Sequence, residues 1–109
     1  MSKSIYFDTV NEFEKYGNKN GFYLETEIKK ALFDCKTSEE RAKLVIDNCV
    51  GFIRGNNDLK VAFGLIYNYM PSKFYYKGNY ESMAMLISAY AFNLINEYEF
   101  NRTIGFKLL

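Results

Sequence analysis

The residues that usually carry enzymatic chemistry are scarce in this chain, since its 109 residues include no histidine. Without an imidazole there is no Ser-His or Cys-His nucleophile pair and no general base of the commonest kind. The two cysteines, Cys35 and Cys49, cannot by themselves complete a structural zinc site, which normally takes four Cys or His ligands. The composition therefore predicts a protein that is not an enzyme and that binds no metal and no cofactor.

Carboxylates remain as acid–base groups, but their spacing does not bring them together. On a helix, two residues separated by one position point to different sides, and three glutamate pairs have this spacing. A fourth pair is adjacent and falls in a predicted first helical turn, where the helix dipole explains it. The glycines match neither of the common phosphate-binding loops, and no Asp-rich calcium loop is present. The pairs are Glu12 and Glu14, Glu25 and Glu27, Glu97 and Glu99, and Glu39 and Glu40.

The stretch that follows Pro71, the only proline, combines aromatic rings with lysines. The chain has 10 Tyr and 10 Phe, more rings than a domain of this size buries, although codon bias toward AT-rich codons is an equal explanation. Exposed rings supply rigid contact area, and lysines complement an acidic partner protein. The residues predicted to bind a partner are Lys73, Phe74, Tyr75, Tyr76, Lys77 and Tyr80.

Two other interpretations of this stretch stay open. Phe74 and Tyr76 would plug the end of a helical bundle, with Tyr75 and the lysines in solvent. Alternatively, tyrosine rings would stack on nucleic-acid bases while Lys60, Lys73 and Lys77 contact phosphates. The net charge of +1 and the scarcity of arginine argue against nucleic acid, because phosphate contacts dominate such affinity. A helix-turn-helix over residues 38–70 is less favoured than a simple antiparallel helix pair, because its second helix lacks arginine.

These residues must be positioned by helices, and the most apolar of them covers Met83–Ile95, where only Ser88 and Asn93 are polar. A helix that is apolar on nearly every side must be covered on nearly every side. We expect it to form the centre of the fold, within a long final helix from Tyr80 to about Phe100. Earlier helices are predicted at Thr9–Tyr16, Phe22–Cys35, Ser38–Arg54 and Leu59–Met70.

Boundary residues support this division. Thr37 and Glu40 form a capping-box pattern, Gly55 suits the position after a helix, and Asp58 and Asn79 are N-cap residues. Ser72–Lys77 is predicted as a single helical turn or an irregular loop. The predicted fold is all-α, a compact bundle of four to five helices around a buried C-terminal helix, in one domain spanning residues 1–109.

The two chain ends are less regular. Ile104, Phe106 and Leu108 alternate with polar or small residues, which is strand periodicity. We expect the tail either to pair with Ser4–Phe7 as a minor two-stranded patch or to dock on the bundle or a second subunit. A homodimer through the last helix and the tail follows from their excess of apolar residues.

The expected function is that of a small non-enzymatic protein-interaction domain, acting as an inhibitor, adaptor or regulatory subunit of a larger protein. Its AT-rich residue usage suits a phage or mobile element of a low-GC bacterium. The alternative is a nucleic-acid-binding regulator that uses a Lys/Tyr patch, and an enzyme or ligand carrier ranks last. Residues 1–20 lack the apolar core of a signal peptide, and the apolar run is shorter than the ~18 residues of a membrane span, so we expect a cytoplasmic protein with reduced thiols.

Overall fold

The computed structural model describes residues 26–56 and 59–105, and these residues are helical or lie in short connections. They contain no strand, so the predicted all-α class is confirmed. The elements are α2 (Thr26–Asp34), α3 (Ser38–Asn56), α4 (Leu59–Tyr69), two single 3₁₀ turns, η1 (Ser72–Phe74) and η2 (Tyr76–Gly78), α5 (Tyr80–Ala91) and α6 (Glu97–Ile104).

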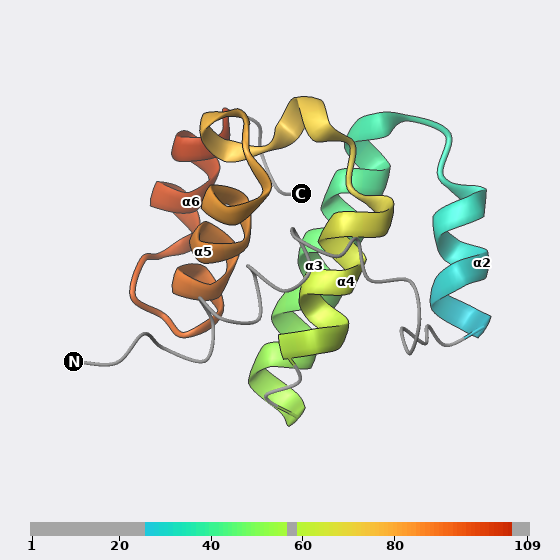
Figure 1. Cartoon of the computed structure of the whole chain (residues 1–109), viewed down its shortest axis with the longest axis horizontal. Coiled ribbons are helices and arrows are strands. Elements are labelled where there is room, and N and C mark those ends of the chain that lie inside the picture. The colour runs from blue at the N-terminus through green and yellow to red at the C-terminus, as the bar shows by residue number, and fades with distance from the viewer. Residues whose placement is uncertain (1–25, 57–58, 106–109) are drawn as a thin grey trace.

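The helices are arranged around the pair α3 and α4, which run antiparallel in the middle of the molecule (Figure 1). Helix α5 packs against both of them, and α6 packs against α5. Helix α2 lies on the other side of α3, at the edge of the molecule (Figure 1). Because α3 and α4 are adjacent in sequence as well as in space, these two helices form the antiparallel pair that the sequence favoured.

The hydrophobic core draws on all five of these helices, and α4 supplies its centre. Ala62 to Ile66 are all buried, so α4 is covered on every side along this segment. Helix α5 buries Met83, Ala84 and Ile87 on its inner face, whereas Met85 remains 39% exposed. The run Met83–Ile95 is therefore covered on fewer sides than its composition predicted.

The expected single helix from Tyr80 to Phe100 is wrong, because the structure breaks it after Ala91. Asn93 adopts a left-handed conformation with φ of 63°, which asparagine tolerates better than most residues. The Asn96 side chain then accepts a hydrogen bond of 2.8 Å from the Glu99 amide and caps α6. The break folds α6 back on α5, where the Phe100 and Tyr90 rings stack with centroids 4.6 Å apart.

The capping box at the start of α3 is confirmed. The Glu40 amide donates to Thr37 Oγ1 and the Thr37 amide donates to Glu40 Oε1, and each donor–acceptor distance is 3.0 Å. Asn79 is confirmed as the N-cap of α5, since its side chain accepts from the Ser82 amide. The prediction that Gly55 follows the end of α3 is wrong, because α3 continues through Asn56 and glycine permits a left-handed turn without requiring one.

Several expectations concern residues outside the described ranges. The helix at Thr9–Tyr16, the strand at Ser4–Phe7, the cap at Asp58 and the start of the helix predicted at Phe22 lie there. Ile104 belongs to α6, so the strand periodicity does not hold at that residue, while Phe106 and Leu108 lie outside. Within the described part of the chain, no helix combines the length and the hydropathy that crossing a membrane requires.

Candidate functional site

The stretch predicted to bind a partner forms the connection between α4 and α5. Pro71 follows the end of α4, and the chain then makes the turns η1 and η2. Lys77 and Gly78 have φ of 56° and 72°, which reverses the chain just before Asn79 caps α5. The segment predicted as one helical turn or an irregular loop consists of two single 3₁₀ turns.

Two tyrosine hydroxyl groups form hydrogen bonds from this part of the chain to α4. The Tyr80 hydroxyl donates to the Phe63 carbonyl over 3.1 Å, and Tyr67 meets the Tyr80 ring edge-on with centroids 5.4 Å apart. The Tyr75 hydroxyl donates to the Ile66 carbonyl over 3.4 Å, and its ring lies 6.3 Å from that of Tyr80. Burial, together with the nearby Tyr67, raises the pKa of Tyr75 above its ordinary value.

Of the six residues predicted to contact a partner, Tyr80 is only 5% exposed and belongs to the core. Phe74, Tyr75 and Tyr76 are half-buried, and Lys73 and Lys77 are exposed. Surface contact is therefore available to the lysines and to the outer edges of the three half-buried rings.

The two lysines lie over the rings beside them. Lys73 Nζ is 5.2 Å from the centroid of Phe74, and Lys77 Nζ is 5.3 Å from that of Tyr76. Neither ammonium group forms an ion pair within residues 26–56 and 59–105, where the one ion pair joins Lys43 and Asp47. We call Lys73, Phe74, Tyr76 and Lys77 the basic turn, because they present two positive charges above a half-buried aromatic surface.

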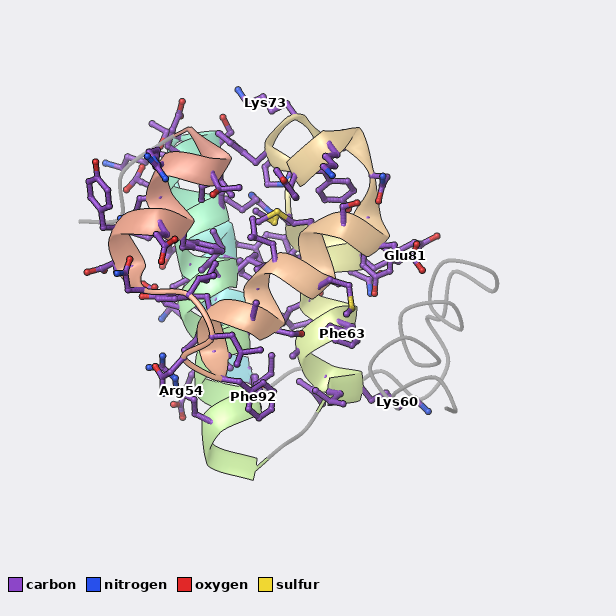
Figure 2. The ribbon with its side chains drawn as sticks, turned by 90° about the vertical axis from the view of Figure 1, so that its left-hand side faces the viewer. Arg54, Lys60, Phe63, Lys73, Glu81 and Phe92 are labelled. Atoms are coloured by element: carbon purple, nitrogen blue, oxygen red, sulfur yellow. The ribbon has the colours of Figure 1, made fainter. Side chains whose placement is uncertain are left out.

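Lys60, the third lysine of the nucleic-acid interpretation, does not belong to the basic turn. It is in the first turn of α4, whereas Lys73 follows the end of that helix, so the two lie at opposite ends of α4 (Figure 2). An 11-residue helix is about 17 Å long, and the three lysines therefore do not form one patch.

An open groove of about 450 Å³ lies between α2 and α3. Three of its polar side chains are engaged locally: Glu40 belongs to the capping box, and Lys43 pairs with Asp47 at a distance of 2.7 Å. No group of acidic or cysteine side chains among the described residues has the geometry of a metal site. The lining residues are Ala31, Asp34, Cys35, Glu40, Lys43, Leu44 and Asp47.

The two cysteines are free thiols in different environments. Cys49 is fully buried and its Sγ donates to the Ala62 carbonyl over 3.0 Å. Burial raises the pKa of this thiol far above its ordinary value, so it stays protonated and unreactive. Cys35 is half-buried at the groove, and its Sγ lies 3.3 Å from the Ala31 carbonyl. Cys49 therefore packs in the core, and Cys35 is only partly enclosed.

Arg54 has a structural role that the sequence did not indicate. From the last turn of α3, its Nε donates to the Ala91 carbonyl over 2.7 Å. Its Nη2 lies 3.2 Å from the Tyr90 carbonyl and 3.1 Å from Asn93 Oδ1. The guanidinium group also lies 5.6 Å from the Tyr90 ring centroid. Arg54 thus holds the C-terminal end of α5 and the left-handed turn that follows it.

Comparisons of the chain with protein-family models, with curated proteins and with solved structures find no significant match.

Proposed function

We propose that this protein is a small non-enzymatic protein-interaction domain that binds an acidic segment of a larger protein at the basic turn. In that role it acts as an inhibitor, adaptor or regulatory subunit. The observation that carries the proposal is the pair of exposed ammonium groups, Lys73 and Lys77, each held over an aromatic ring without a carboxylate partner among the described residues. A phage or mobile element of a low-GC bacterium remains the expected source, on residue usage alone.

The construction of the basic turn suits recognition. The tyrosine hydrogen bonds to α4 hold the backbone between the helices in place, so little conformational entropy is lost when a partner binds. The half-buried Tyr76 ring places an aromatic edge next to the charges, and tyrosine is enriched among interface hot spots. Exposed lysines steer an acidic partner toward the basic turn, and the affinity that such charges provide falls as salt is added.

Nucleic-acid binding is the less well supported alternative. Stacking of a base needs an accessible ring face, and Tyr75 is half-buried with its hydroxyl bonded to α4. Lys60 is too distant to extend the charge of the basic turn, which by itself offers two lysines to phosphates.

The test is an affinity pull-down with the tagged full chain from a low-GC bacterial lysate, with a nuclease-treated duplicate. The double variant Lys73→Glu/Lys77→Glu reverses the charge of the basic turn. The matched control is Lys29→Glu/Lys30→Glu, which makes the same charge change at two exposed positions of α2. We expect one protein partner that survives nuclease, is lost with the first variant and is retained by the control.

The captured protein is then purified and its dissociation constant is measured at increasing salt. Weaker binding at higher salt supports an acidic segment at the basic turn. Retention by Lys73→Glu/Lys77→Glu would place the contact elsewhere, and recovery of nucleic acid would favour the alternative.

A further inference from the structure

The outward side of α5 carries an accessible apolar stripe with charge at its ends. Met85 is 39% exposed and Phe92, at the end of the helix, is 41% exposed. Ala89 lies between them along the helix and is partly exposed. Glu81, one turn before Met85, begins the stripe (Figure 2). Residues four apart occupy the same side of a helix, so Glu81, Met85 and Ala89 are aligned.

The opposite end of this stripe is positively charged. The Arg54 guanidinium lies beside the end of α5, next to Phe92 (Figure 2). Its Nε and Nη2 donate to the end of α5, and its Nη1 makes no hydrogen bond within the described residues. Two N–H donors of a fixed guanidinium group are therefore left for a carboxylate.

We propose that this stripe is the interface of a homodimer in which α5 packs antiparallel against α5 of a second copy, with Glu81 of each copy facing Arg54 of the other. A two-fold axis brings the same surface of both copies together. If Met85 faces Ala89 of the second copy, Glu81 faces Asn93 of that copy. Asn93 is the residue to which the Arg54 guanidinium is bonded, so the apolar and charged contacts fit one register.

The packing in this register is complementary in size as well as in charge. The large, flexible Met85 side chain meets the small Ala89, and the Phe92 ring falls opposite Ser82. Antiparallel helices also place the positive end of one helix dipole beside the negative end of the other. One helix face buries less than the roughly 1,600 Å² of a standard interface, so the dimer is weak and depends on concentration.

The test is sedimentation equilibrium of the full chain over a range from about 10 μM to about 1 mM, where weak dimers dissociate. We expect a mass that rises from one chain toward two. Glu81→Lys turns two symmetry-related attractions into repulsions and should weaken dimerisation at least about tenfold. Ala89→Glu puts a charge at the centre of the stripe and should give a monomer at every concentration.

The matched control is Glu39→Lys, because Glu39 occupies the same position after the cap of α3 as Glu81 occupies in α5. It repeats the charge change and the loss of helix-dipole stabilisation and should leave the dimer unchanged. Circular dichroism confirms that each variant is folded. The variant Lys73→Glu/Lys77→Glu should also dimerise normally. The dimer and the proposed function can therefore be disproved separately.

A mass of one chain at all concentrations would overturn the dimer, and so would a dimer that Glu81→Lys and Ala89→Glu leave intact. If the chain is monomeric and Ala89→Glu instead abolishes capture of the pull-down partner, the stripe binds that partner and the dimer is equally overturned.

Discussion

At the scale of single residues, Arg54 shows how a side chain from one helix stabilises the end of another. The last carbonyl groups of a helix have no partners within it and carry the negative end of its dipole. Arg54 supplies donors to the carbonyls of Tyr90 and Ala91 and a positive charge at the same point. It also bonds Asn93, whose left-handed conformation begins the turn toward α6.

Arg54→Lys keeps the charge but loses the planar fork that bonds three acceptors at once. We expect the free energy of unfolding to fall by about 1–2 kcal/mol, because the hydrogen bonds to the end of α5 are charge-assisted. Urea denaturation measures the change. The control Arg102→Lys alters an arginine that lies over the exposed Tyr98 ring, and we expect a change of less than about 0.5 kcal/mol there. Equal effects at both positions would show that Arg54 does not hold α5.

At the scale of secondary structure elements, α3 is the longest helix among the described residues and contains two glycines. A Cβ added at Gly51 would meet no atom within 4 Å, and the backbone there is helical. No neighbouring segment therefore requires a glycine at this position. Gly51 lowers the stability of the folded protein, because glycine gives the unfolded chain more conformational freedom.

Gly51→Ala should therefore stabilise the protein by about 0.5–1 kcal/mol, as judged by its thermal or urea unfolding midpoint. Gly105→Ala should do the opposite, because Gly105 ends α6 with φ of 79°, where alanine is strained. A destabilising Gly51→Ala would mean that α3 is distorted at this point in solution.

The start of α3 provides a second prediction at this scale. Thr37→Ala removes the oxygen that accepts from the Glu40 amide, and we expect a loss of about 1 kcal/mol in unfolding free energy. The neighbouring Ser38→Ala serves as the control, since the one hydrogen bond of the Ser38 hydroxyl within the described residues is a long one of 3.4 Å to the Glu39 carboxylate. If both variants unfold alike, the capping box does not stabilise α3.

At the scale of the whole molecule, the core is built on the α3–α4 pair, and titratable groups are enclosed in it. The Cys49 thiol is fully buried between these helices, and Tyr75 is held against α4. Burial raises the pKa of both groups, so the folded protein holds protons that the unfolded chain releases at high pH. The stabilisation is complete below the ordinary pKa values and is lost as the pH rises above them.

Stability should therefore decline above about pH 9, the ordinary value for the Cys49 thiol, by about 1.4 kcal/mol per pH unit for this one proton. Urea denaturation at a series of alkaline pH values measures the slope. Cys49→Ala should reduce the slope of unfolding free energy against pH by the contribution of one proton, although this variant is less stable at neutral pH. An unchanged slope in Cys49→Ala would contradict a buried, protonated Cys49.

Local patterns in the sequence were enough for the helical class, for the helix that starts after Thr37, for the helix that starts at Leu59 and for the Asn79 cap. These features depend on apolar spacing and on hydrogen bonds between residues three or four apart, which are contained in the sequence itself. The break after Ala91 had its signals in Asn93 and Asn96, but the apolar composition of Met83–Ile95 outweighed them.

Tertiary structure alone decided which sides of the helices are covered and which polar groups meet. The burial of Tyr80, the exposure of Met85 and the contact of Arg54 with α5 join residues far apart in the chain. These contacts exist because α5 packs against α3 and α4. No local spacing encodes that choice, because it depends on how whole helix surfaces fit together.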